Sequence, residues 1–294
     1  MAPSPAAESR AEHSFVDADG ITVFYDVYPA SGTPRGVVQI AHGVGEHAGR
    51  YRVLAETLAR EGFVVYADDH RGHGRTGMAQ HGGDARRLGR LGAGGHRSAV
   101  AAVWQFTRLI RGEQPDLPLV LLGHSWGSFL AQIVLNDHPD AYDAVVLSGS
   151  ALRWPGSLNA GSLNARWKAP GATGAEWLSS DPAVAREFVA DPLTTLTPLL
   201  RLFGPADAVR LFGRPRRNLG HDVPLLLMVG RDDPVGGPRS VHRLADAYRT
   251  RSGLTDVTTL VYPGARHEIF NEVMQDEVRA DLVAWLEARI PARD

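Results

Sequence analysis

The chain has 294 residues, which fits one domain with an insertion or two small domains, and 44% of its residues are hydrophobic. Its net charge of -2 argues against nucleic acid as a partner and against electrostatic binding to anionic membranes. The absence of cysteine excludes disulfides and thiolate chemistry, and no apolar run approaches the roughly 20 residues that stable membrane insertion needs.

The first elements predicted are a tail and a hairpin. Residues 1–12 are rich in Ala, Pro and Ser and lack the apolar core of a signal peptide, which predicts a disordered tail. A cytoplasmic location is the default expectation for such a chain. Residues 14–27 predict a β-hairpin, because an Asp-Ala-Asp-Gly turn joins two apolar arms.

Strands and helices then alternate along the chain. Short apolar runs predict buried strands, and apolar residues on one helical face predict the helices between them. The expected strands cover 36–41, 63–67, 119–122, 144–147, 225–229 and 258–262, and the expected helices cover 51–59, 96–111, 129–134, 240–248 and 273–290. The Gly- and charge-rich stretch 68–76 predicts a loop. This order predicts an α/β fold with a mostly parallel sheet and helices on both faces.

The alternation stops in a proline-rich middle segment. Seven prolines fall between Pro155 and Pro215, with only short helix-like pieces between them. This interruption predicts a helical cap over 151–221, inserted into a core made of 13–150 and 222–294.

The stretch 119–127, LVLLGHSWG, contains the most informative motif. Gly123, Ser125 and Gly127 match the G-x-S-x-G nucleophile elbow, in which a serine stands on a sharp turn between a strand and a helix. Side chains at the two glycine positions would collide with neighbouring backbone, and the N-terminal N–H groups of the helix favour developing negative charge. The motif alone is weak evidence, since glycine and serine are common in this chain.

The base and the acid for Ser125 are expected at other strand ends, where reactive groups gather in an open parallel sheet. Asp233 follows the strand at 225–229, and His267 follows the strand at 258–262. The order Ser, Asp, His along the chain is that of the α/β-hydrolases. Asp232 is the competing acid, and Asp233 is preferred because Pro234 stiffens the loop directly after it.

The oxyanion of a tetrahedral intermediate needs two N–H donors. The residue after the nucleophile supplies one of them, which is Trp126. The second donor is expected from the turn after an early strand, where Val44 is the candidate.

Five motifs in order along residues 20–290 resemble one family. They are HGVGEHAGRY, DDHRGHGRT, GHSWGS, GRDDPVG and YPGARHEIFNE. Together they resemble the monoacylglycerol lipase and lysophospholipase-like serine hydrolases, which are sometimes grouped with the serine aminopeptidases. The resemblance implies the α/β-hydrolase fold with an eight-stranded sheet, a mobile cap over an apolar acyl pocket, and ester hydrolysis without a cofactor or metal. It maps the nucleophile, acid, base and oxyanion donors to the residues named above.

The resemblance also implies supporting roles and one departure. Glu46 and His47 would brace the oxyanion turn, as Arg71 and His73 would brace a neighbouring loop. The family usually has Met where Trp126 stands, and a bulky indole beside the acyl carbon would shorten the pocket. The candidates for substrate contact are Trp126, Leu178 and Phe203, although packing of the cap is the better explanation for most of its apolar residues.

The sequence therefore predicts a serine hydrolase that cleaves small-molecule carboxylic esters, with monoacylglycerols or similar lipid-like esters as substrates. A short-chain carboxylesterase is the close alternative. An alternative from a different class of protein is a nucleotide-binding oxidoreductase, because Gly43-x-Gly45 begins a G-x-G-x-x-A pattern that such an enzyme would also have. A metal site of four loop histidines and a non-catalytic ligand receptor are further alternatives, while the oligomeric state stays open. The four histidines are His42, His47, His70 and His73.

Overall fold

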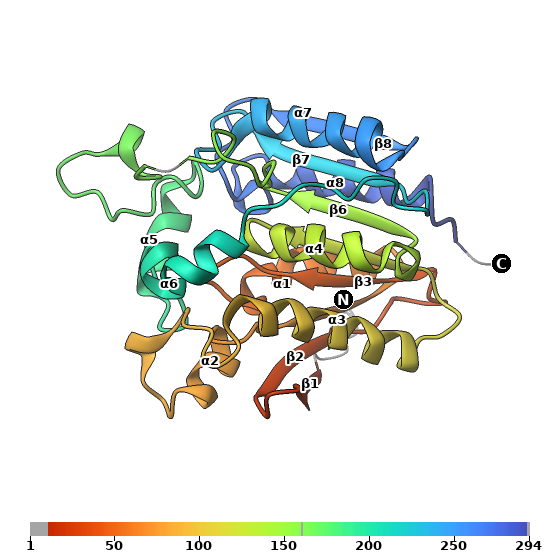
Figure 1. Cartoon of the computed structure of the whole chain (residues 1–294), viewed down its shortest axis with the longest axis horizontal. Coiled ribbons are helices and arrows are strands. Elements are labelled where there is room, and N and C mark those ends of the chain that lie inside the picture. Colours follow the sequence, from red (N-terminus) through yellow and green to blue (C-terminus); the bar gives the residue numbers. More distant parts are fainter. Residues whose placement is uncertain (1–10, 160, 293–294) are drawn as a thin grey trace, which may run out of the picture.

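The structure is a computed structural model that describes residues 11–159 and 161–292. An eight-stranded sheet forms its centre (Figure 1). The strands are β1 (Ala11–Val16), β2 (Thr22–Tyr28), β3 (Gly36–Ala41), β4 (Phe63–Asp68), β5 (Leu119–His124), β6 (Ala144–Ser148), β7 (Leu225–Gly230) and β8 (Val257–Tyr262). They lie in the order β1-β2-β4-β3-β5-β6-β7-β8. The pairs β1/β2 and β2/β4 are antiparallel and the other five pairs are parallel, as the sequence predicted for the core.

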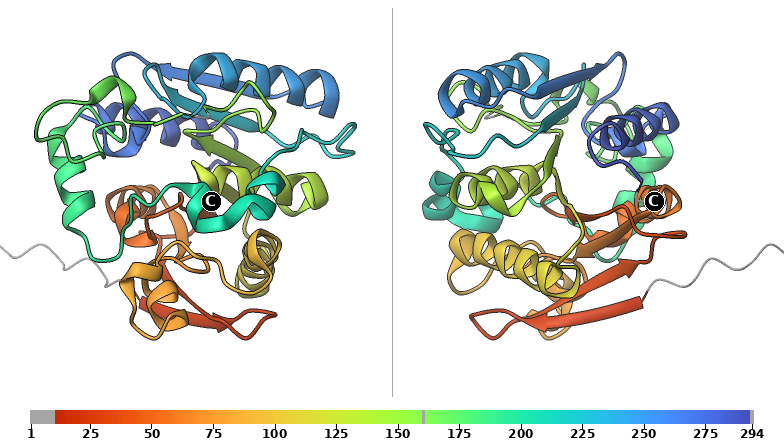
Figure 2. Two further views of the ribbon diagram at one scale, coloured as in Figure 1. Left: turned by 60° about the vertical axis from the view of Figure 1, so that its left-hand side comes forward. Right: turned by 90° about the vertical axis from the view of Figure 1, so that its right-hand side faces the viewer.

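Helices cover both faces of the sheet (Figure 2). They are α1 (Arg52–Arg60), α2 (Gly74–Gln80), α3 (Gly95–Glu113), α4 (Trp126–Asp137), α5 (Pro182–Ala190), α6 (Leu199–Arg210), α7 (Gly237–Ala247) and α8 (Gln275–Glu287). The buried residues of α3, α4 and α7 share one hydrophobic core, and those of α1 and α8 share the other. No helix in the described ranges has both the length and the hydropathy to cross a membrane.

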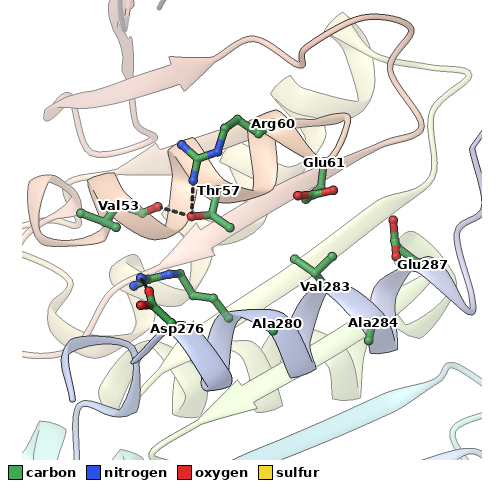
Figure 3. A pocket seen from close by; sticks show the side chains of 10 residues that line it. Val53, Thr57, Arg60, Glu61, Asp276, Ala280, Val283, Ala284 and Glu287 are labelled. Carbon is green, nitrogen blue, oxygen red and sulfur yellow. Dashed lines mark hydrogen bonds and ion pairs between the residues drawn. The ribbon is translucent and has the colours of Figure 1, made fainter. Parts of the chain in front are cut away.

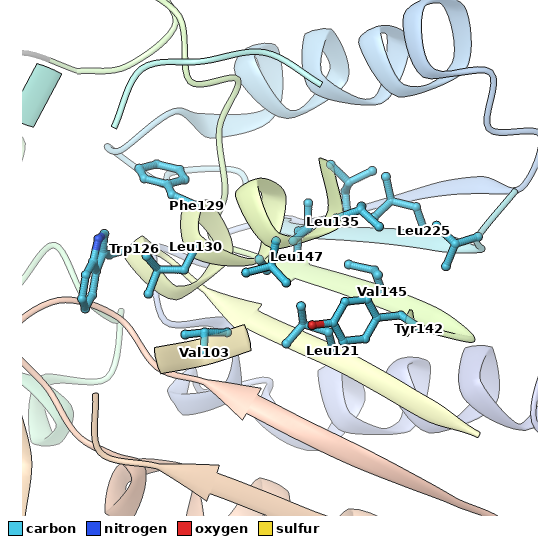
Figure 4. Close-up of a cluster of buried hydrophobic side chains, with 14 of the residues drawn as sticks. Val103, Leu121, Trp126, Phe129, Leu130, Leu135, Tyr142, Val145, Leu147 and Leu225 are labelled. Carbon is cyan, nitrogen blue, oxygen red and sulfur yellow. The ribbon is translucent and has the colours of Figure 1, made fainter. Parts of the chain in front are cut away.

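Strand β5 shows how a continuous apolar run becomes a strand buried on both faces. Leu119 and Leu121 face the core under α3, α4 and α7, whereas Val120 and Leu122 face the core under α1 and α8 (Figure 4 shows the first core). All four side chains are 0–1% exposed. Because side chains pack against both faces of β5, the strand holds the turn after its C-terminal end rigidly, at the side of the sheet where the parallel strands end.

The cap leaves the sheet after β6 and returns at β7. Its two helices, α5 and α6, lie beyond the carboxyl ends of the parallel strands (Figure 1). Helix α6 is kinked at Gly204, which has φ 72°, directly before Pro205. The segment between β6 and β7 covers residues 149–224, and the predicted boundaries of the cap at 151 and 221 fall inside this segment.

Two local expectations differ from the structure. Strand β1 begins at Ala11, so residues 11 and 12 pair with β2 instead of belonging to the predicted tail; residues 1–10 lie outside the described ranges. The predicted loop 68–76 ends in the first turn of α2, which begins at Gly74. This short helix was missed because two of its seven residues are glycine, a poor helix former.

Candidate active site

Ser125 stands on a strained turn between β5 and α4. Its backbone has φ 51° and ψ -121°, a conformation that residues other than glycine rarely adopt. Only glycine fits at the two flanking positions, because a side chain there would overlap neighbouring backbone atoms. A methyl group on Gly123 would lie 2.7 Å from the Gly127 carbonyl oxygen, and one on Gly127 would lie 2.1 Å from the Ala41 carbonyl oxygen. The predicted strand, sharp turn and helix are therefore present at Ser125.

Hydrogen bonds hold this turn in place. The Ser125 N–H donates to the Ser148 carbonyl oxygen at 2.9 Å, and the Ser128 hydroxyl donates to the Ser125 carbonyl oxygen at 2.5 Å. The Ser125 residue itself is half-buried at the N-terminus of α4. An anion at this point would meet the positive end of the helix dipole.

Asp233 and His267 form a buried pair at the ends of β7 and β8. His267 Nδ1 lies 3.0 Å from Asp233 Oδ1, which also accepts the Val235 N–H at 2.8 Å. Both side chains are at most 2% exposed. Asp232 lies elsewhere, where its side chain is 36% exposed and pairs with Arg166 at 3.0 Å. Of the two candidate acids, the structure brings Asp233 to His267.

The electrostatic surroundings of His267 favour its protonated form. Burial opposes the charge most strongly, but Asp233, with smaller contributions from Glu268 and Glu46, outweighs burial and raises the pKa of His267. The neighbouring His124, with its ring centroid 4.7 Å from that of His267, behaves in the opposite way. Burial, His267 and Arg50 hold the pKa of His124 well below its usual range, so this ring is neutral.

The second ring nitrogen of His267, Nε2, makes no hydrogen bond to the described part of the protein and is free to accept a proton. This atom is buried, and it is not hydrogen-bonded to Ser125 Oγ in this structure. An ionised Asp233 can only accept, so its bond to Nδ1 fixes the hydrogen of the neutral ring there and leaves the lone pair on Nε2. The Trp177 ring of the cap covers the imidazole, with ring centroids 4.9 Å apart.

The turn that carries Val44 lies directly against Ser125. A methyl group on Gly43 would lie 3.1 Å from Ser125 Cβ. Glu46 Oε1 accepts the Gly43 N–H at 2.6 Å and the Tyr51 hydroxyl at 2.7 Å, which fixes the turn from below. Gly43, the residue directly before Val44, therefore lies against Ser125, and the role of the Val44 N–H as an oxyanion donor stays a prediction.

The Trp126 side chain, directly after Ser125 in the chain, is buried among aromatic rings from the core and the cap. It is 1% exposed and is surrounded by four rings with centroids 5.1–6.2 Å away: His70, His73, His96 and Phe203. Burial lowers the pKa of His73 and of His96 to about 4, so both rings are neutral near pH 7. Phe203 belongs to α6 of the cap, so the cap and the core meet at this indole.

The cap contacts the core at two places near Ser125 and His267. On the oxyanion side, the Thr195 N–H donates to the Gly45 carbonyl oxygen at 2.8 Å, and His47 pairs with Asp191 at 2.9 Å. On the side of the base, the Glu268 N–H donates to the Leu178 carbonyl oxygen at 2.7 Å. The Leu178 side chain is 2% exposed and packs inside the cap against Ala175, Ala185 and Phe188.

The residues behind the alternative predictions have other partners. Both carboxylates at the end of β4 have partners within the protein: Asp68, the last residue of the strand, contacts His70, and Asp69 accepts the Ala48 N–H. A methyl group on Gly45 would lie 2.4 Å from the Thr195 carbonyl oxygen, so cap backbone occupies the space beside the glycine-rich turn. Within the described ranges, no three or more His, Asp or Glu side chains are arranged to hold a metal ion.

Two cavities of about 400 Å³ lie outside this site. One is a groove between α1 and α8, lined by residues such as Val53, Thr57 and Ala280 (Figure 3). The other lies between α1 and α5 and is lined in part by His47, Arg50 and Asp191. Ser125 and His267 line neither of these two cavities.

Sequence reasoning missed one charged contact at the site. Arg50 and Glu268 form a bidentate ion pair at 2.6 and 2.7 Å, although 218 positions separate them in the chain. Both residues lie within motifs that carry the family resemblance, and the position of Glu268 directly after His267 was the one available signal. No periodicity or spacing rule links two such distant charges.

Comparisons with known proteins agree with the observed fold. The family model described as serine aminopeptidase, S33, matches residues 32–274. The chain is 35% identical to a monoacylglycerol lipase of Mycolicibacterium smegmatis over 95% of this chain and 98% of the relative. It is 30% identical to a mouse (Mus musculus) monoglyceride lipase over 94% and 90% of the two chains. Among solved structures, a thermostable carboxyl esterase from Bacillus coagulans is 26% identical, covers 96% of this chain and 99% of its own, and superposes with a TM-score of 0.78.

Proposed function

Because this chain belongs to the serine aminopeptidase S33 family of α/β-hydrolases and is a carboxylic ester hydrolase, we propose that it cleaves monoacylglycerols or similar lipid-like esters through an acyl-enzyme on Ser125. The observation that supports this most is the buried Asp233–His267 pair at the strand ends next to the nucleophile elbow. A small-molecule ester is the partner in this proposal. The cytoplasm is its proposed location, which subcellular fractionation would test.

The first half of the proposed reaction forms the acyl-enzyme. Ser125 Oγ attacks the ester carbonyl carbon while His267 Nε2 accepts the hydroxyl proton. The hydrogen bond between these two atoms forms when substrate binds, since such bonds are often long or misaligned before then. Asp233 keeps the hydrogen on Nδ1 and stabilises the imidazolium. The protonated ring then gives its proton to the departing alcohol oxygen as the ester bond breaks.

The second half releases the acid. Water takes the place of the alcohol, His267 removes one of its protons, and the resulting hydroxide attacks the acyl carbon. The Ser125 oxygen leaves with the proton from His267, and the free carboxylic acid departs. In both halves the N–H groups of Val44 and Trp126 stabilise the oxyanion. Each such donor is worth about 10²–10³ in rate.

A rate profile tests the substrate class. We expect monoacylglycerols to be hydrolysed with a higher kcat/KM than acetate or butyrate p-nitrophenyl esters, because Phe203 of α6 packs against Trp126, the residue directly after Ser125, and offers apolar surface to an acyl chain. The measurement is kcat/KM across p-nitrophenyl esters of increasing length, with monoacylglycerols assayed beside them. A maximum at two to four carbons with no monoacylglycerol hydrolysis would favour the short-chain carboxylesterase alternative.

The same profile tests the role of the indole. Trp126→Ala should move the preferred acyl length upward, because removing the ring opens space between the core and Phe203. Truncating a buried Trp costs about 3–5 kcal/mol of stability, so Trp126→Met serves as a better-packed second variant. The matched control is Trp154→Ala, since that ring is 43% exposed at the edge of the cap. An unchanged chain-length profile in both Trp126 variants would remove this role.

A further inference from the structure

A buried bridge of three charged side chains lies behind the catalytic loop. Arg50 donates to both carboxylate oxygens of Glu268, at 2.6 and 2.7 Å, and to Glu46 at 3.3 Å. The two carboxylate side chains are 4% exposed and the arginine side chain is 12% exposed. We call Glu46, Arg50 and Glu268 the Arg50 bridge.

The Arg50 bridge joins the two loops on which the proposed chemistry depends. At one end, Glu46 accepts the N–H of Gly43 in the oxyanion turn. At the other end, Glu268 follows His267 in the chain and also accepts from the Asn271 side chain at 3.0 Å. The arginine therefore fixes the distance between the oxyanion turn and the loop of the base.

Two residues of the Arg50 bridge also contact the cap. The Arg50 guanidinium lies over the Phe188 ring of α5, 4.6 Å from the ring centroid. The Glu268 backbone N–H donates to the Leu178 carbonyl oxygen of the cap. The bridge thus has contacts with the oxyanion turn, the base loop and the cap.

The charges of the bridge are costly if stability is their only purpose. Removing ions from water costs several kcal/mol each, and well-packed apolar replacements of buried ion pairs are often equally stable or more stable. Burial disfavours the charge on Arg50, but Glu268 and Glu46 outweigh burial and raise its pKa, so the guanidinium stays charged. Burial and the neighbouring Glu268 raise the pKa of Glu46. Once both carboxylates are ionised, the bridge carries one net negative charge, and Glu268 directly follows His267 in the chain.

We propose that Glu268 is a positioning residue for His267: through Arg50 it holds the base loop against the oxyanion turn, and its charge stabilises the imidazolium that forms during proton transfer. This inference rests on the proposed function. It assigns to Glu268 a part in the reaction that the Ser125, His267 and Asp233 triad alone does not include.

The charge effect has a definite sign. The charged and titratable groups around the imidazole are Asp233, Glu268, Glu46, His124 and Arg50. His267 must be neutral to accept a proton, and its raised pKa moves the acid limb of the wild-type pH profile to higher pH than an ordinary histidine would give. Removing the charge of Glu268 lowers the pKa of His267, because a negative charge near the imidazolium is lost. The positive charge of Arg50 is then less neutralised, and this also lowers the pKa of His267. The acid limb should therefore move to lower pH.

Glu268→Gln tests the charge. We expect the acid limb of kcat/KM for a p-nitrophenyl ester to move down by about half a pH unit, since Arg50 screens part of the 1–3 unit effect of a nearby charge. The rate on the pH plateau should fall by about 10-fold as the loop loosens. The matched control is Glu56→Gln, which removes one carboxylate from the exposed Arg52–Glu56 pair and should leave the profile unchanged.

Glu268→Asp separates charge from position. The shorter side chain keeps its charge but cannot reach both Arg50 nitrogens, so the plateau rate should fall while the acid limb stays near its wild-type position. This variant also carries the test if Glu268→Gln does not fold. An unmoved acid limb in Glu268→Gln, with only a lower Tm, would overturn the proposal, as would wild-type plateau rates in Glu268→Asp.

The two proposals fail differently. If Ser125→Ala keeps its activity, the proposed function fails whatever the Glu268 variants do. If Ser125→Ala is inactive and Glu268→Gln retains the wild-type pH profile and rate, the triad stands and only the role of Glu268 is rejected.

Discussion

Replacing Ser125 with alanine should abolish ester hydrolysis and leave the fold intact. We expect kcat to fall by about 10⁶-fold, as it does when the nucleophile of a hydrolytic triad is removed. Only the hydroxyl is lost, and the turn is held by backbone bonds to Ser148 and by Gly123 and Gly127, which the substitution does not touch. The measurement is kcat for a p-nitrophenyl ester, with the melting temperature recorded on the same preparation.

The control for this variant is Ser162→Ala, which removes a hydroxyl from an exposed cap residue and should leave kcat within a factor of about two of wild type. Retained turnover in Ser125→Ala, together with an unchanged melting temperature, would refute the assignment of the nucleophile. A fall in both variants would point to a general loss of folded protein instead.

Replacing Asp233 with asparagine should have the second largest effect, a fall in kcat of about 10⁴-fold. The asparagine amide can offer an N–H to His267 Nδ1, where Asp233 now accepts at 3.0 Å. The ring would then carry its hydrogen on Nε2 and could not accept the proton of Ser125. Stopped-flow or long-time-course assays on the same ester would measure the loss.

Asp232→Asn is the matched control, because it makes the same chemical change one residue earlier. Asp232 contacts Arg166 at the surface, so its loss should change kcat by no more than a few-fold. The opposite pattern, a large loss in Asp232→Asn and a small one in Asp233→Asn, would move the acid to Asp232.

The core of the fold was predictable because its strands are short apolar runs. The run at Leu119–Leu122 is buried on both faces, and its short length with a glycine directly after it favours a central strand over a buried helix. The chain order of Ser125, Asp233 and His267 was readable for a related reason. Parallel strands put their carboxyl ends on one edge, so residues just past three strands converge there.

The remaining features depend on contacts that no local pattern records. Helix α2 forms in a glycine-rich stretch because it packs on β2, where Thr76 accepts the Phe24 N–H at 2.9 Å. Trp126 was expected beside the acyl site, but the histidine rings that enclose it come from separate segments of the chain. The pairing of Arg50 with Glu268 joins the first and last parts of the core. Such contacts are set by the folded topology, which the sequence specifies only as a whole.

Covalent labelling tests the central claim most directly, that Ser125 is the nucleophile activated by the His267–Asp233 pair. The enzyme would be treated with a p-nitrophenyl alkylphosphonate, and the modified peptide located by mass spectrometry. We predict one phosphonyl group per chain, on Ser125, formed in step with the loss of esterase activity and formed much more slowly in Asp233→Asn. An adduct on another residue, or full loss of activity with Ser125 unmodified, would contradict the account.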